Sequence, residues 1–72
     1  MMNTTKVAGF NKLVELLNAG GVVLDMPMIG YKVFTDNTTW SVRSDAFWKA
    51  RKQGLLRWAG ADGMTGKWKG WQ

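Results

Sequence analysis

The chain has 72 residues, a formal net charge of +5, and neither cysteine nor histidine. That length accommodates one domain with one hydrophobic core. A disulfide framework and the usual zinc ligands are excluded, because both need side chains that are absent here. We therefore expect a single domain over residues 1–72 with no metal and no cofactor, in which the five tryptophans supply much of the apolar area.

The positive charge is unevenly distributed along the chain. Residues 1–36 contain equal numbers of basic and acidic side chains, so the whole excess lies in residues 37–72. Such an asymmetry is typical of a surface that faces a polyanion. An ordinary solvated face of a small basic protein gives the same pattern. The sequence leaves both interpretations open.

A first helix is predicted near the start of the chain. Its apolar positions recur at i, i+3, i+4 and i+7, and they are Phe10, Leu13, Val14 and Leu17. Thr4 or Thr5 is expected to cap its first turn, although Gly9 favours a regular helix that begins nearer Phe10. The pair Gly20-Gly21 is expected to end the helix, because glycine adopts the left-handed conformation of a C-cap at little cost.

Short strands are predicted after this helix. Residues 21–25 and 30–34 are rich in β-branched and aromatic side chains, with a bend expected at the intervening Met26-Pro27-Met28. Residues 35–38 have the composition of a turn. Residues 39–42 fit either a third strand or a short helical turn, so the conformation of residues 36–43 stays open.

A second helix is predicted after these strands, with Ser44 as its N-cap, Asp45 in its first turn and Gly54 at its end. Phe47 faces inward on the helical wheel. The side chains expected on the outer face are Trp48, Lys49 and Lys52.

A C-terminal β-hairpin is predicted to complete the domain. Its strands are expected at residues 55–58 and 67–71, joined by a loop over residues 59–66. In that hairpin Lys67 and Lys69 share one face, and the tryptophan between them points to the other. The expected fold class is therefore a small α+β domain.

Catalysis is not expected. The chain offers no histidine as a general base and no cysteine as a nucleophile, and its five carboxylates are scattered. Residues 60–63 lack the lysine and the following helix of a phosphate-binding loop. We therefore interpret the protein as a binding protein and not as an enzyme.

A cytoplasmic location without membrane insertion is expected. The apolar stretch Val22–Ile29 is interrupted by Asp25 and Pro27 and is too short to span a bilayer. No secretory signal is recognisable. The Lys67–Trp71 segment suits a membrane surface in composition, but it lacks a long apolar face, so this interpretation ranks last.

Basic residues flank four of the five tryptophans, namely Trp40, Trp48, Trp58 and Trp68. Lysine and arginine neutralise phosphates, and exposed rings stack on unpaired bases. The alternative is that the rings are buried and the basic side chains cover them. We expect Trp40, Trp58 and Trp68 to be core residues, because so small a chain needs their area. Trp48 is expected to be exposed, because Phe47 already faces inward.

Residues 42–56 resemble the recognition helix and following strand of winged-helix domains. The matching features are the valine and serine at its start, the central aromatic pair Phe47-Trp48 and the closing Gly54-Leu55-Leu56. The resemblance implies a small winged-helix-like domain with two helices packed on a short antiparallel sheet and the C-terminal β-hairpin as the wing. Winged-helix domains carry another helix before the recognition helix, whereas residues 20–43 are predicted to form strands and turns.

The resemblance also implies a DNA-binding surface. In such proteins the recognition helix enters the major groove and the wing contacts phosphate. Ser44, Trp48, Lys49 and Lys52 would then face the groove, and Arg57, Lys67 and Lys69 would lie on the wing. Arg43 is added to this set because it is positively charged and lies near Trp40 in the sequence.

The favoured interpretation is a small non-enzymatic nucleic-acid-binding protein that acts as a regulator. In size, charge and compactness the chain also resembles bacteriophage accessory proteins, so the alternative is a protein that binds and modulates a host protein. Exposed Trp48, Met26 and Met28 would be its hydrophobic anchors, unless the methionines fill the core. A homodimer is compatible with so small a core.

Overall fold

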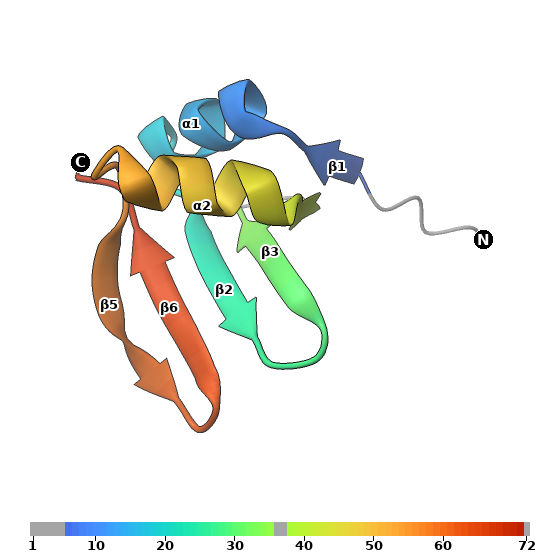
Figure 1. Cartoon of the computed structure of the whole chain (residues 1–72), viewed down its shortest axis with the longest axis vertical. Helices are drawn as coiled ribbons and strands as arrows, with labels where there is room; N and C mark the ends of the chain where they lie inside the picture. Colours follow the sequence, from blue (N-terminus) through green and yellow to red (C-terminus); the bar gives the residue numbers. More distant parts are fainter. Residues whose placement is uncertain (1–5, 36–37, 72) are drawn as a thin grey trace.

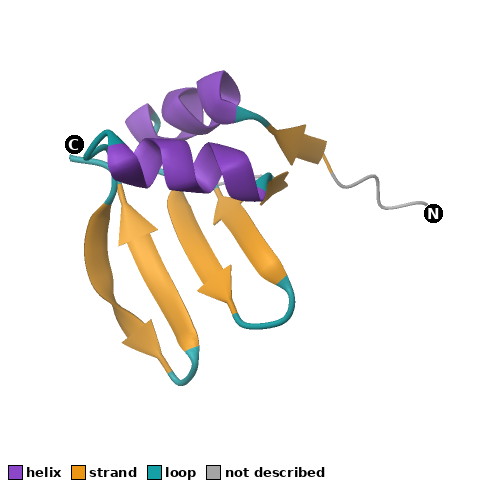
Figure 2. Cartoon of the chain, viewed as in Figure 1, coloured by secondary structure: helices purple, strands orange, loops and turns teal. Residues whose placement is uncertain are grey.

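The computed structural model describes residues 6–35 and 38–71. These residues form a mixed sheet of six strands in the order β1-β4-β3-β2-β6-β5, together with two helices (Figures 1 and 2). The elements are β1 (Lys6–Ala8), α1 (Phe10–Asn18), β2 (Val22–Met26), β3 (Gly30–Phe34), β4 (Thr39–Val42), α2 (Ser44–Lys52), β5 (Arg57–Asp62) and β6 (Thr65–Lys69). The predicted α+β class is confirmed. The sheet is mixed, because β1 pairs with β4 in parallel while the other pairs are antiparallel.

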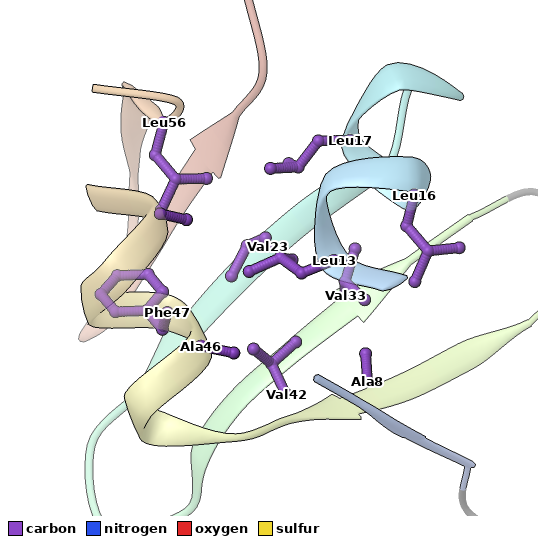
Figure 3. Packing of buried hydrophobic residues seen from close by; sticks show 11 residues of the cluster. Ala8, Leu13, Leu16, Leu17, Val23, Val33, Val42, Ala46, Phe47 and Leu56 are labelled. Atoms are coloured by element: carbon purple, nitrogen blue, oxygen red, sulfur yellow. The ribbon is translucent and has the colours of Figure 1, made fainter. Parts of the chain in front are cut away.

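Both helices pack on the same face of the sheet. Val23 and Val33 face each other across β2 and β3, and both are fully buried beneath the helices. Figure 3 shows how leucines of α1, Phe47 of α2 and these valines converge from the two layers. Side chains alternate between the faces of a strand, so every second residue of β2, β3 and β6 points away from the helices. No described residue forms a layer over that second face.

Phe47 lies at the centre of the contact between α2 and the sheet. Its ring stacks on Tyr31 of β3, with centroids 4.0 Å apart and planes at 12°. It also makes an edge-to-face contact with Trp68 of β6, with centroids 5.9 Å apart. One aromatic side chain therefore joins α2 to two strands that are not neighbours in the sheet order.

The helices begin as the apolar pattern indicates, but their caps differ from the prediction. α1 begins at Phe10, next to Gly9, and Thr4 and Thr5 lie outside the described residues. Ser44 is the first residue of α2 and makes no capping hydrogen bond, so its prediction as N-cap is wrong. The backbone N–H of Ala46 instead donates to the Asp45 carboxylate at 3.0 Å. Neither nine-residue helix, nor any other helix in the described ranges, is long and apolar enough to cross a membrane.

The strands predicted between the helices are confirmed, and residues 39–42 form a strand and not a helical turn. This region thus contains β2, β3 and β4 in the place where winged-helix domains carry a further helix. The C-terminal hairpin is part of the main sheet, because β6 also pairs with β2. The winged-helix assignment itself stays a prediction.

The loop predicted over residues 59–66 is shorter in the structure. β5 continues to Asp62, and only Gly63 and Met64 form the turn. The register shifts between Trp58 and Ala61, so that two residues of β5 oppose one residue of β6. Such a bulge accommodates Gly60, whose φ of 103° is unfavourable for residues with a side chain.

Glycine is required at the junction between α1 and β2. A Cβ atom on Gly21 would lie 2.8 Å from the backbone oxygen of Leu16 and 3.0 Å from Cγ2 of Val33. Cβ atoms essentially never lie as close as 2.8 Å to another heavy atom, so the helix end would have to shift to accept a side chain here. The chain therefore turns from α1 into the centre of the sheet only because this position lacks a side chain.

Candidate nucleic-acid interface

The structure divides the eight predicted binding residues between two faces of the sheet. Arg43, Ser44, Trp48, Lys49 and Lys52 lie on α2 or directly before it, in the helix layer, and all are exposed. Lys67 and Lys69 alternate with Trp68, whose ring packs under α2, so both lysines point to the opposite face. Arg57 faces the same way, because it pairs directly with Lys69. The helix group and the hairpin group therefore form two surfaces.

The first surface is an aromatic ridge made of Trp48, Arg51, Trp68 and Trp58. The guanidinium carbon of Arg51 lies 5.1 Å from the ring centroid of Trp48 and 4.9 Å from that of Trp68. Trp68 continues to Trp58 in an edge-to-face contact with centroids 5.1 Å apart. The two outer rings, Trp48 and Trp58, are 52% and 55% exposed. The ridge thus presents two accessible indoles that a cation–π contact and ring packing hold in place.

A further cation of α2 lies beside the ridge, because Lys52 is exposed one position after Arg51. Lys49 points towards α1, where its ammonium lies 4.4 Å from the ring centroid of Phe10. Arg43 forms an exposed ion pair of 3.2 Å with Asp45, a contact that contributes little to stability. Within the described ranges, no ion pair involves Lys49, Arg51 or Lys52. Their charges are therefore available to an anion.

Carboxylates also lie near the ridge, since Asp45 precedes Trp48 by three positions on α2. Asp25 of β2 pairs with Gly66 of β6 on the helix-facing side of the sheet. Gly66 supports the outer ring of the ridge, because a Cβ atom there would lie 2.8 Å from the Trp58 ring. An anionic ligand on the ridge would therefore be expected to keep its phosphates on the α2 side, away from Asp25.

The second surface, here called the open face, is the helix-free side of the sheet. Its cations are Lys32, Arg57, Lys67 and Lys69. In register, Lys32 and Lys67 flank Leu24 in one row across β3, β2 and β6. The neighbouring row is Phe34, Val22, Lys69 and Arg57. The open face is therefore a sheet surface on which aliphatic and aromatic side chains lie between basic ones.

Negative charge is scarce on the open face. Asp62 pairs with Thr65 beside the hairpin turn, and it is the one carboxylate that the register places on this side within the described ranges. It lies at the far end of the hairpin from Arg57 and Lys69. Arg57 is held in position, because its Nε donates a hydrogen bond of 3.0 Å to the backbone oxygen of Gly70.

Several residues of these surfaces were missed by the sequence-based selection, among them Trp68, which was expected in the core and is partly buried there. Arg51 follows Trp48 by three positions, a spacing that brings two side chains together on a helix, so the signal was present. Trp58 was expected in the core, and this prediction is wrong. It lies on the edge strand β5, where only one neighbouring strand packs beside it. Lys32 lies on the open face because β3 pairs with β2, and the sequence does not specify that pairing.

The other tryptophans lie apart from the ridge. Trp40, partly buried as expected, lies beneath the ammonium groups of Lys6 and Lys12, at 5.2 and 4.9 Å from its ring centroid. Trp71 is exposed, but its Nε1 donates a hydrogen bond of 2.9 Å to the backbone oxygen of Gly54. That bond ties the chain after β6 to the end of α2.

Hollows in the described surface are small. One of about 160 Å³ lies at the end of the open face and is lined in part by Arg57 and Lys69. This volume is below the range of roughly 300–1,000 Å³ that is usual for small-molecule sites. The described residues contain no group of three or more histidine, cysteine, aspartate or glutamate side chains that could hold a metal ion.

The arrangement would suit an extended ligand better than an enclosed small molecule. Flat aromatic and cationic surfaces bind chains with repeated charges and ring systems more readily than they enclose a small molecule. Comparison of the chain with known protein families, curated proteins and solved structures finds no significant match.

Proposed function

We propose that this protein is a small non-enzymatic nucleic-acid-binding protein that acts as a regulator and contacts its ligand through α2 and the C-terminal hairpin. The observation that carries the proposal is the aromatic ridge, in which the Arg51 guanidinium lies against both Trp48 and Trp68. Lys52 on the same helix supplies positive charge beside it, and Lys49 adds to the positive charge of α2 on the side that faces α1.

The ridge favours nucleic acid with unpaired bases. Trp48 and Trp58 are each about half exposed, and every base offers a ring face on which an indole can stack. In a duplex those faces are covered by neighbouring bases. We therefore expect single-stranded DNA or RNA to bind more tightly than duplex DNA of the same length, with phosphates directed towards α2.

Reversing two charges of α2 tests this proposal. The Lys49→Glu/Lys52→Glu variant is expected to bind labelled single strands at least about tenfold more weakly at low salt, because two phosphate contacts become repulsive. The slope of log affinity against log salt should also become shallower by about 1.4, since each single-strand phosphate contact contributes about 0.7. Fluorescence anisotropy at several salt concentrations measures both quantities for single-stranded DNA, single-stranded RNA and duplex DNA.

The matched control is Lys6→Glu/Lys12→Glu, which changes the net charge equally. Lys6 lies on β1, at the other edge of the sheet from β5, and Lys12 lies on α1. This control should retain most of the affinity. Equal losses in the two variants would show that binding follows only the overall charge, and no binding by the unmodified protein would refute the proposal.

A second candidate function is the binding and modulation of a host protein. Met28, Ile29 and Met64 are exposed at the turns of the β2–β3 and β5–β6 hairpins. Both turns lie at the same end of the strands, at the bottom of Figure 1. Methionine is common at protein interfaces.

Serine substitutions at the two turns test this candidate. A stoichiometric partner retained from a nuclease-treated host lysate by the unmodified protein should be lost with Met28→Ser/Met64→Ser, because the variant lacks its apolar anchors. Quantitative mass spectrometry of the retained proteins measures the loss. The Lys49→Glu/Lys52→Glu variant is the control and should keep the partner. Retention of that partner by the serine variant would exclude the turns as its binding site.

A further inference from the structure

The open face and the aromatic ridge lie on opposite sides of the same strands. On β6, Trp68 contributes to the ridge, whereas Lys67 and Lys69 point to the other side. On β5, Trp58 and Arg57 are divided in the same way. A nucleic-acid segment stacked on the ridge is therefore separated from the open-face cations by the backbone of the sheet.

We propose that the open face is a second nucleic-acid-binding surface and that one molecule thereby joins two nucleic-acid segments. The inference rests on the proposed function and adds a second site with its own residues. Its cations are Lys32, Arg57, Lys67 and Lys69, and its apolar side chains are Val22, Leu24 and Phe34.

The positions of these side chains fit a single strand laid across the sheet. Neighbouring strands are about 4.8 Å apart, so the backbones at Lys32 and Lys67, with β2 between them, are separated by about 10 Å. Leu24 lies between the two lysines, and Phe34, which is 38% exposed, lies in the next row. A sheet with a ring and aliphatic groups among lysines can contact bases while the lysines neutralise phosphates.

Charge identifies the occupant as a polyanion. Four cations of the open face are opposed by Asp62, which lies at the far end of the hairpin. None of the four takes part in an ion pair within the described ranges. Protein interfaces are depleted in lysine at their centres, whereas lysines flank Leu24 and Val22 on this sheet. Phosphate is therefore a better partner for this surface than the core of a protein interface.

Simultaneous binding of two short strands tests the inference. Donor-labelled and acceptor-labelled oligonucleotides of about 4 nucleotides, at the lower end of single-strand site sizes, are used so that one strand cannot pass around the edge of the sheet and fill both faces. With the unmodified protein we expect energy transfer between the two labels. Sedimentation analysis should show a complex of one protein molecule with two oligonucleotides.

The Lys67→Glu/Lys69→Glu variant is expected to abolish energy transfer and to reduce the stoichiometry to one oligonucleotide per protein, with a remaining affinity no weaker than that of the equally charged Lys6→Glu/Lys12→Glu protein. The ridge and the helix layer are unchanged in this variant, and an unchanged melting temperature would show that it folds. The Lys6→Glu/Lys12→Glu protein, with the same net charge, should still give energy transfer.

Three results would overturn the inference without refuting the proposed function. One-to-one binding without energy transfer by the unmodified protein would show that the open face is only solvated, and the proposed function would stand. Energy transfer retained by Lys67→Glu/Lys69→Glu would place the second segment elsewhere. A complex with two protein molecules would attribute the joining to a homodimer. Absence of any oligonucleotide binding would instead refute the proposed function and this inference together.

Discussion

Replacing Phe47 by alanine is expected to destabilise the domain by about 3–5 kcal/mol. The side chain is 1% exposed, and it stacks on Tyr31 and contacts Trp68, so the substitution leaves a cavity where α2 meets the sheet. A domain of this length has a total free energy of unfolding of about 4–11 kcal/mol. The variant should therefore lose a large fraction of its free energy of unfolding and unfold at a clearly lower urea concentration, which urea denaturation followed by tryptophan fluorescence measures.

Phe34→Ala is the matched control, because it removes the same side chain from the open face. The Phe34 ring is 38% exposed, and we expect a loss of about 1 kcal/mol or less. Similar losses at the two positions would contradict the packing described here, since they would mean that the second face of the sheet is covered as well as the first.

Removing both outer rings of the ridge has the largest expected effect on binding. Stacking of a base on an aromatic side chain contributes about 1–3 kcal/mol, so Trp48→Ala/Trp58→Ala should weaken single-strand binding by about 30-fold or more. The salt dependence should stay unchanged, because no phosphate contact is lost. Anisotropy titrations at several salt concentrations distinguish this loss from that of the α2 lysine variant, in which the slope changes as well.

Trp71→Ala provides the comparison for the double variant. Trp71 is exposed like the ridge rings, but it lies outside the ridge and donates its hydrogen bond to Gly54. We expect its replacement to lower stability slightly and to leave affinity nearly unchanged. An equal loss of affinity with Trp71→Ala would indicate that any exposed indole binds the strand. That result would contradict the assignment of the binding site to the ridge.

Local patterns in the sequence predict much of the fold. The apolar spacing of Phe10, Leu13 and Leu17 indicates α1, and the β-branched residues of β2 indicate a strand. β1 could not be predicted in the same way. Lys6–Ala8 is short, and its partner β4 lies more than thirty positions further along the chain, at Thr39–Val42. A strand of that length is stable only through such a distant pairing.

The candidate site was less predictable than the fold, for a related reason. Alternation along β6 indicates that Trp68 and the adjacent lysines point to opposite faces. Which of those faces α2 covers depends on the pairing of β6 with β2 and on the contact between Phe47 and Trp68. Neither interaction leaves a signal in the local sequence. The sequence therefore indicated the basic and aromatic residues, but not their division between two surfaces.

The pairing of β2 with β6 has a consequence for the order of folding. β6 lies between β2 and β5 in the sheet, although it is the last strand along the chain. During synthesis β2, β3 and β4 can pair early, but the edge of β2 stays open until residues 65–69 have been made. Contacts between such distant segments form slowly. The nascent protein therefore passes through a stage in which an apolar strand has an unpaired edge, a feature that attracts chaperones or promotes aggregation.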